Sequence, residues 1–163
     1  MQRSLIAKFC RKNHKMVVIT PPHPIVIKSK SIFLAGSIEQ GKAVDWQNRI
    51  IEKLSPFPFT ILNPRRPDWD SSWEQKIENP QFYEQVNWEL NALEKADMII
   101  LYFDPKSKSP ISLLEFGLFA RTGKMMVCCP EGFWRKGNVD IVCERFNIPQ
   151  KSNLYEIIKE LLK

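Results

Sequence analysis

Short apolar runs alternate with longer segments of helical periodicity from residue 31 to the end of this chain. This alternation predicts strands joined by crossover helices, which gives an α/β domain with a mostly parallel sheet and helices on both faces. The expected strands are the apolar runs at 31–35, 59–62, 98–103 and 124–129. The expected helices lie at 43–54, 82–95, 110–122, 139–146 and 154–162.

The positive charge of the chain is concentrated near its start. Residues 1–30 contain seven Lys or Arg and no Asp or Glu, whereas the remainder contains 17 basic and 18 acidic residues. We therefore expect a basic N-terminal extension over residues 1–30 and one domain over residues 31–163, a length that suits a single domain. Two apolar fragments of the extension, 16–20 and 24–27, could be edge strands or parts of an extended arm, because prolines separate them.

Several classes of partner are disfavoured by composition. The basic extension has no interleaved aromatic residues and no nucleic-acid-binding motif, so a nucleic-acid partner ranks last. No apolar run approaches the roughly 20 residues that a membrane-spanning helix needs. The basic start is not followed by a long apolar stretch, so a secretory signal is not expected and a cytoplasmic location is.

The four cysteines do not form a metal-binding or disulfide pattern. Cys128 and Cys129 are adjacent in an expected strand, so their side chains should point to opposite faces. His14 and His23 are far from them in sequence. We expect small buried side chains in a reducing compartment, and neither a metal nor an organic cofactor.

Ligands of parallel α/β sheets bind at the carboxyl ends of the strands, close to the point where the strand order reverses. The loop after the first expected strand contains Gly36, Ser37 and Ile38, and a second glycine follows at position 41. Such a loop lets backbone N–H groups approach an anion at the start of a helix. The alternative is a plain turn between a strand and a helix.

A carboxylate lies in an apolar helix that follows the strand 98–103. Ser112 and Glu115 belong to the first turns of this helix, whose other residues are mostly apolar. A carboxylate in this setting is costly unless it is paired or functional, and the helix dipole should favour its ionised form. An ionised carboxylate can attack an anomeric carbon. The alternative is a capping or salt-bridged glutamate.

Further polar and aromatic residues could complete a site for a nucleoside. Glu89, on the preceding helix, could donate a proton to a departing base, although a solvated helix residue is the alternative. Asp97 should lie at the start of the strand 98–103, whereas Asp104 lies at its exit, where it could contact a sugar or a base. The aromatic residues of the long loop 65–80 and its flank could stack on a base or serve as a core or lid.

Four segments together resemble one known family. They are FLAGSI at 33–38, NWELNALEKADMIILYF at 87–103, SPISLLEFGLFA at 109–120 and GNVD at 137–140. The chain resembles, over roughly residues 31–145, the nucleoside 2-deoxyribosyltransferases and the related 2′-deoxynucleoside 5′-phosphate N-hydrolases. The resemblance implies a flavodoxin-like, doubly wound fold and a homo-oligomer.

The resemblance also implies roles for individual residues. Glu115, in the motif E-x-G, matches the nucleophile, and Glu89 matches an acidic position that is commonly Asp in the family. Ser109 matches a serine that contacts the 5′-phosphate, and the turn 36–38 resembles the loop on the phosphate side. Asn138 lies close to the position of an asparagine that a neighbouring subunit contributes. A tyrosine expected in the first strand has no counterpart here, which leaves selection at the 2′-hydroxyl unassigned.

The expected function is cleavage of the N-glycosidic bond of a nucleoside or nucleotide through a covalent glycosyl-Glu115, with transfer of deoxyribose to a nucleobase or to water. Asp104, Ser109, Ser112 and the turn 36–38 are expected to bind the substrate. The alternative is a non-catalytic nucleotide-binding or sensing module, in which Glu115 binds only sugar hydroxyls.

Overall fold

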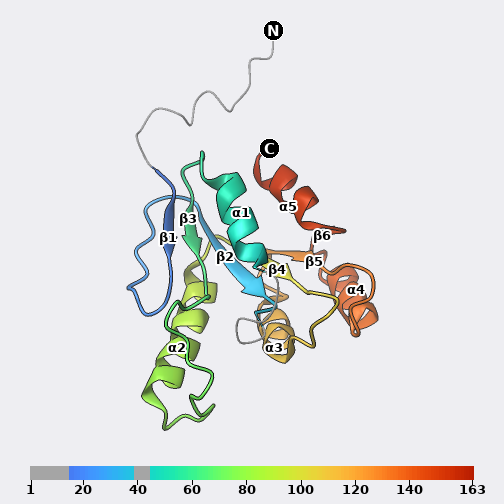
Figure 1. Ribbon diagram of the computed structural model, residues 1–163. Coiled ribbons are helices and arrows are strands. Elements are labelled where there is room, and N and C mark those ends of the chain that lie inside the picture. Colours follow the sequence, from blue (N-terminus) through green and yellow to red (C-terminus); the bar gives the residue numbers. More distant parts are fainter. Residues whose placement is uncertain (1–14, 39–44) are drawn as a thin grey trace.

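The computed structural model describes residues 15–38 and 45–163, and six parallel strands form one sheet within them (Figure 1). The strands are β1 (Val17–Ile19), β2 (Ser31–Gly36), β3 (Thr60–Leu62), β4 (Met98–Tyr102), β5 (Met125–Cys128) and β6 (Gln150–Lys151). The helices are α1 (Trp46–Leu54), α2 (Pro80–Lys95), α3 (Pro110–Phe119), α4 (Lys136–Arg145) and α5 (Leu154–Leu161). Expectations for residues 1–14 and 39–44, among them His14 and Gly41, fall outside the described residues.

The strands follow the order β1-β3-β2-β4-β5-β6 across the sheet. From β3 onward this is the flavodoxin-like order, in which the second strand of the core lies outside the first and the third lies on its other side. β1 adds one more strand at the edge beside β3, so the fragment 16–20 contains an edge strand, whereas 24–27 does not. The predicted doubly wound fold is confirmed, and its order reverses between β2 and β4.

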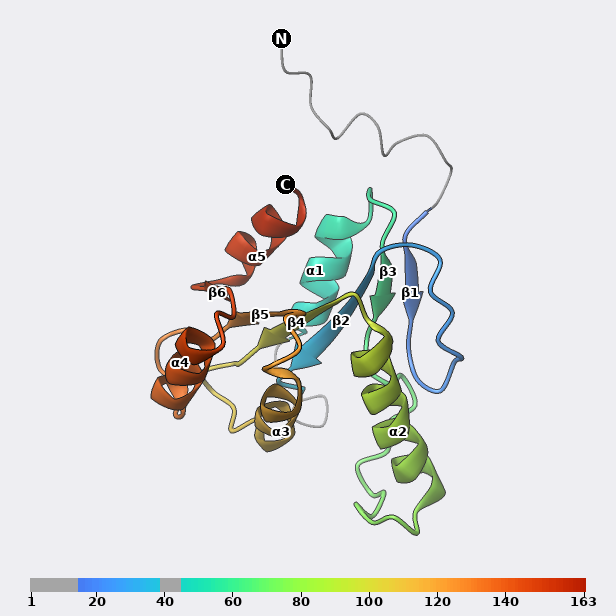
Figure 2. The same ribbon diagram turned by 180° about the vertical axis from the view of Figure 1, so that it is seen from behind.

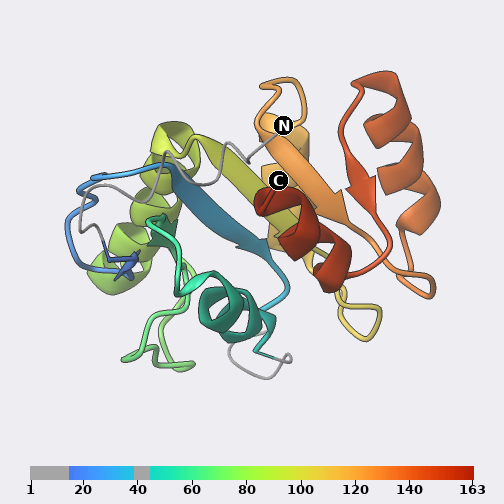
Figure 3. The same cartoon turned by 90° about the horizontal axis from the view of Figure 1, so that it is seen from above.

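Helices cover both faces of the sheet (Figures 2 and 3). On one face α1 and α5 pack through Trp46, Ile50, Leu54 and Ile157. On the other face α2, α3 and α4 contribute Leu93, Phe116 and Val139, among others. The central strands are buried on both sides, which explains their nearly continuous apolar sequences.

Some boundaries differ from those expected for local reasons. Helix α1 begins at Trp46, because the side chain of Asp45 caps it by accepting a hydrogen bond from the backbone N–H of Asn48. Helix α4 begins at Lys136, earlier than expected. Strand β6 was missed, because its two residues are polar and carry no alternation that would indicate a strand.

The adjacent cysteines point to opposite faces, as predicted. Cys128 belongs to the core beneath α1 and α5, and Cys129 to the core beneath α2, α3 and α4. Burial raises the pKa of both thiols to about 12, so they stay protonated at neutral pH. Across residues 15–38 and 45–163, no three His, Cys, Asp or Glu side chains are grouped as a metal site would need, and no helix is long and apolar enough to cross a membrane.

Candidate active site

The carboxyl ends of β2 and β4 meet very closely at Gly36. A Cβ atom at this position would lie 2.2 Å from the carbonyl oxygen of Tyr102, and the φ angle of Gly36 is +140°. Only glycine fits this position, because any side chain would collide with the backbone of β4. The close approach holds Ser37 against the loop that follows β4, and the backbone N–H of Ser37 donates to the Tyr102 carbonyl at 3.0 Å.

Three buried serine hydroxyls gather at this point, where the strand order reverses. Ser37 Oγ accepts from the backbone N–H of Asp104 at 2.9 Å and from Ser107 Oγ at 2.8 Å. It lies 2.5 Å from Ser109 Oγ, and the hydroxyls of Ser107 and Ser109 are also hydrogen-bonded. Because Ser37 already accepts twice, its own hydrogen is available for Ser109. The structure therefore joins two predicted residues, Ser37 and Ser109, to an unpredicted one, Ser107.

Ser109 has an unusual backbone for the residue that starts a helix. Its φ and ψ angles are 45° and 53°, in the left-handed region, and its side chain makes no capping hydrogen bond to α3. This conformation costs a residue other than glycine roughly 1–2 kcal/mol. The side chain is directed into the serine cluster instead of onto α3, and strained residues of this kind are frequent at functional sites.

Asp104 and Ile38 flank the serine cluster. The Asp104 side chain is buried, and its Oδ1 accepts from the backbone N–H of Lys106 at 2.8 Å. Its carbonyl oxygen accepts from the backbone N–H of Ser107 at 3.0 Å. Asp104 thus shapes the turn that presents the serines. Ile38, next to Ser37, is half-buried.

Glu115 is buried in the second turn of α3, with 8% of its surface exposed. Ser112 precedes it by three residues, which places both buried side chains on one face of the helix. Glu115 forms no ion pair with any of the described residues. The capping or salt-bridged glutamate considered above is therefore not what the structure shows.

The protonation of Glu115 differs from the expectation. Burial, and then the negative charge of Glu89, raise its pKa to about 8. The prediction that the helix dipole favours the ionised form is wrong, because the dipole acts mainly within the first turn and Glu115 is the sixth residue of α3. Desolvation of the carboxylate outweighs it.

Glu89 is half-buried on α2, and burial raises its pKa to about 7. A hydrogen bond from Gln85 Nε2 to Glu89 Oε1, at 2.8 Å, acts in the opposite direction. The two glutamates lie close enough for the charge of one to affect the other. They therefore titrate as a pair, and the first proton to leave makes the second harder to remove.

The sequence model of one protein family, described as "Nucleoside 2-deoxyribosyltransferase like", matches residues 29–133. The chain belongs to this family. The matched region includes Glu89, Glu115 and the serine cluster, and it ends before Asn138.

The nucleoside 2-deoxyribosyltransferase-like chain also has a counterpart among solved structures. It is similar to the crystal structure of a conserved protein from Enterococcus faecalis V583, with a TM-score of 0.59 and 10% sequence identity. The similarity covers 82% of this chain and 98% of that one. At this level of identity the match supports the fold alone. No curated protein matches the chain closely enough to count as a relative.

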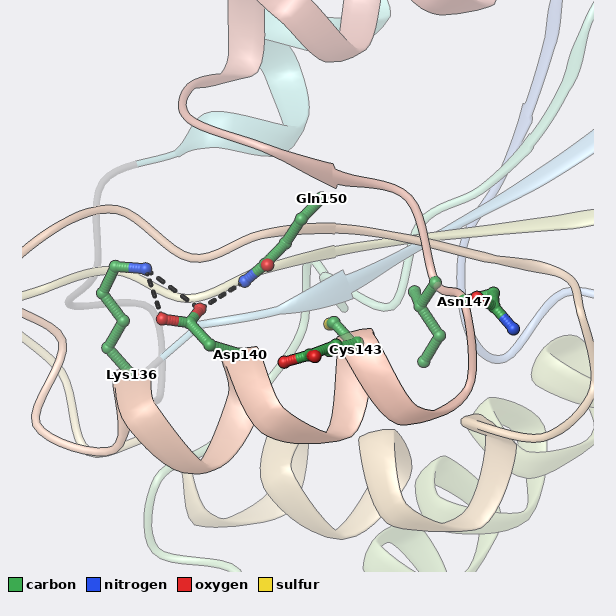
Figure 4. A pocket seen from close by; sticks show the side chains of 7 residues that line it. Lys136, Asp140, Cys143, Asn147 and Gln150 are labelled. Atoms are coloured by element: carbon green, nitrogen blue, oxygen red, sulfur yellow. Dashed lines mark hydrogen bonds and ion pairs between the residues drawn. The ribbon is translucent and has the colours of Figure 1, made fainter.

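Asn138 lies on α4, whereas the paired glutamates of this family member lie on α2 and α3. It is exposed on α4, and no described contact joins it to Glu89 or Glu115. A surface hollow of about 550 Å³ lies along α4 and β6, where Lys136 and Gln150 both contact Asp140 (Figure 4). Neither glutamate lines this hollow.

The long loop before α2 is held together by its own side chains. The rings of Trp69 and Trp73 meet edge to face with centroids 5.2 Å apart, and the guanidinium of Arg66 lies 5.0 Å from the Trp73 ring centroid. Arg66 also pairs with Asp68 and Glu84, each at 2.9 Å. The two tryptophans are therefore packed within the loop, whereas Tyr83, on α2, is exposed.

Sequence reasoning missed two contributors to the site. Ser107 lies in the loop after β4, where Ser109 was the only serine predicted to bind substrate, because it matches a position in the family. Gln85 lies four residues before Glu89 on α2, a spacing that predicts neighbouring side chains on a helix. That spacing was the one available signal, and it does not reveal burial.

Proposed function

We propose that this member of the nucleoside 2-deoxyribosyltransferase-like family cleaves the N-glycosidic bond of 2-deoxynucleosides or their 5′-phosphates, with Glu115 as nucleophile and Glu89 as general acid. The observation that carries the proposal is the pair of interacting carboxyl groups, Glu89 and Glu115, whose pKa values are both raised toward neutrality. Such shifts are typical of catalytic acids and bases. Family membership supplies the substrate class.

In the first step, an oxygen of the Glu115 carboxylate attacks C1′ of the sugar. The bond between C1′ and the base nitrogen breaks, and its electron pair moves to the base, which takes a proton from Glu89. The products of this step are a glycosyl ester of Glu115, a free base and the Glu89 carboxylate.

In the second step, a nitrogen of another base, or a water oxygen, attacks C1′ on the ester. The bond between C1′ and Glu115 breaks, its electrons return to the carboxylate, and the acceptor gives its proton to Glu89. Two displacements at one carbon retain its configuration. Both carboxyl groups return to their starting forms, so the cycle needs no metal or redox cofactor.

The raised pKa values leave one proton on the pair near neutral pH, and because the higher value belongs to Glu115, this proton must move to Glu89 before Glu115 can attack. A pair with pKa values of about 7 and about 8 retains one proton between those values. One carboxylate and one carboxylic acid are then present together, as the mechanism requires. Positive charge developing at C1′ favours the state in which Glu115 is the carboxylate and Glu89 carries the proton.

The serine cluster is proposed as the subsite for the 5′ end of the substrate. Ser37 and Ser109 offer hydroxyls beside the Gly36 turn, close to the start of α3. Their hydrogens can rotate from one another to the oxygens of a phosphate or of a 5′-hydroxyl. Ser112, on the face of α3 that carries Glu115, is proposed to contact the sugar.

A second copy of the chain is proposed to cover the outer face of α3. Ile111, Leu114 and Leu118 follow helical spacing there and are 57–59% exposed, with no charged residue among them. Such a row on a short helix suits self-association better than exposure to water. Contact through α3 would bring another copy to the helix that carries Glu115. The neighbour could then supply Asn138, and sedimentation of the Leu114→Lys variant at a lower mass than wild type would support this interface.

The decisive experiment incubates the protein with a deoxynucleoside and a different free base, followed by chromatography of the products. Exchange of bases identifies a transferase, and release of free base without exchange identifies a hydrolase. Mass spectrometry of the peptide that contains Glu115 should show one added deoxyribosyl group, and Glu115→Ala should show none.

The same experiment separates catalysis from nucleotide sensing. Binding of nucleotides without any turnover, by a protein whose fold is intact, would contradict the proposed reaction and favour the non-catalytic module. Turnover retained by Glu115→Ala would contradict the nucleophile assignment.

A further inference from the structure

We infer that Gln85 is a positioning residue that confines the acid proton of Glu89 to one oxygen of its carboxyl group, Oε2. The inference rests on the proposed function, because it concerns the acid of that reaction. It begins from the two hydrogen bonds that the Gln85 amide nitrogen donates, at 3.0 Å to the Pro64 carbonyl and at 2.8 Å to Glu89 Oε1.

The Pro64 carbonyl fixes the orientation of the Gln85 amide. A carbonyl oxygen can only accept hydrogen bonds, so it must face the NH₂ group of Gln85 and not its oxygen. Pro64 is buried and follows β3 by two residues, which ties the amide to the backbone at the end of that strand. Both amide hydrogens are then committed, one to Pro64 and one to Glu89.

This orientation decides which oxygen of Glu89 carries the proton. Oε1 accepts from the Gln85 N–H, and the carbonyl oxygen of a carboxylic acid is a better acceptor than its hydroxyl oxygen, so this bond favours the carbonyl at Oε1. The favoured protonated form of Glu89 is therefore the one with its hydrogen on Oε2. Gln85 thus presents a carboxylic acid with a single defined donor atom.

The unpaired oxygen of Gln85 supports a functional reading of this contact. Gln85 is 4% exposed, and its Oε1 is buried without a hydrogen-bond partner among the described residues. Proteins rarely leave a buried acceptor in this state. The arrangement is understandable if the amide nitrogen must stay on Pro64 and Glu89, even though its oxygen then lacks a donor.

The length of the Glu89 side chain leaves its carboxyl orientation to be fixed by a neighbour such as Gln85. A glutamate side chain has one more rotatable bond than an aspartate, so its carboxyl group is free to take more orientations. Gln85, one turn earlier on the same helix, removes that freedom through its bond to Oε1. The same bond partly offsets the rise in the pKa of Glu89 that burial causes.

The test compares Gln85→Met, which keeps the shape but removes the donor, with Gln81→Met, an exposed position one turn earlier on α2. Carboxyl-labelled glutamate and NMR give the pKa of Glu89, with Glu89→Gln to assign its signal. Turnover is measured with a deoxynucleoside and with the 2-deoxyriboside of 4-nitrophenol, whose leaving group needs no acid.

We expect the pKa of Glu89 to be higher in Gln85→Met than in wild type and unchanged in Gln81→Met. Deoxynucleoside turnover should fall about 10- to 100-fold in Gln85→Met, as for impaired acid catalysis, with less than about threefold loss on the nitrophenyl substrate. An unchanged pKa, or an equal loss on both substrates, would overturn the inference. If wild type cleaves neither substrate, the proposed function fails, and the NMR comparison still decides whether Gln85 controls Glu89.

Discussion

Asp97 and Glu115 are carboxylates associated with opposite ends of the central strand β4. Asp97, just before β4, accepts hydrogen bonds at 2.8 Å from both the backbone N–H and the hydroxyl of Ser31. In return, Ser31 Oγ accepts from the Asp97 backbone N–H at 2.9 Å. These bonds lower the pKa of Asp97, whereas burial raises that of Glu115 to about 8.

The comparison shows that carboxyl groups have different environments at the two ends of the sheet. At the amino ends of the strands, a carboxylate is exposed, ionised and matched with donors, so it fastens β4 to β2. At the carboxyl ends, two carboxyl groups share a buried region, and one of them depends on the orienting amide of Gln85. The first arrangement serves stability, and the second is destabilising, a cost that the proposed catalytic role of the two glutamates would explain. Four predictions test this division.

The largest effect should separate the two carboxylates by activity. Glu115→Gln should lower deoxynucleoside turnover by about 1000-fold or more, because it removes the proposed nucleophile. Asp97→Asn should change turnover by less than about threefold, since Asp97 lies at the opposite end of β4 from the proposed site. Steady-state assays on both variants at equal protein concentration measure the two changes in turnover. Equal losses of turnover would mean that the two ends of β4 do not differ in function.

The second effect concerns stability as a function of pH. The folded protein keeps a proton on Glu115 that the unfolded chain releases near the ordinary pKa of 4.5, so wild type loses stability as the pH rises from about 4.5 to about 8. Glu115→Gln has no proton to release here, and we expect it to be more stable than wild type by about 4 kcal/mol at pH 8. Denaturant unfolding at pH 4.5 and pH 8 measures the difference. A gain of equal size at both pH values would argue against a buried, protonated Glu115.

Much of this comparison could be drawn from the sequence, because Asp97 and Asp104 were correctly placed at the start and exit of one strand. The apolar runs and their helical spacers predicted the parallel sheet, since burial on both faces leaves a clear signal. The pKa of Glu115 could not be predicted, because it depends on burial and on Glu89, which is 26 positions earlier in the sequence. Gln85 and Ser107 were missed for the same reason, since their partners Pro64 and Ser37 are distant in sequence.

The third effect concerns the serine cluster at the carboxyl ends. Ser109→Ala and Ser109→Gly both remove the hydroxyl, so each should lose about tenfold in kcat/KM for a deoxynucleoside 5′-phosphate, the equivalent of about one charge-assisted hydrogen bond. Only Ser109→Gly relieves the left-handed backbone at φ 45°, so it should be the more stable of the two by about 1 kcal/mol. Kinetics with and without the 5′-phosphate, together with thermal unfolding, check both parts. Unchanged preference for the phosphate in both variants would remove Ser109 from the proposed subsite.

The smallest effect returns to the amino ends. Asp97→Asn keeps the size of the side chain but removes the charge that strengthens its two bonds from Ser31, and the side chain is exposed, so we expect a loss of only about 1 kcal/mol at pH 7. Because the folded-state pKa of Asp97 is lowered, its contribution is present above the ordinary value of 3.8 and disappears as the pH falls through the lowered folded value. Wild type and Asp97→Asn should therefore converge in stability in strong acid, the opposite of the trend expected for Glu115→Gln, whose advantage grows with pH. Urea titrations across pH 2–8 would reveal this convergence, and a pH-independent difference would mean that the charge of Asp97 does not help to hold β2 to β4.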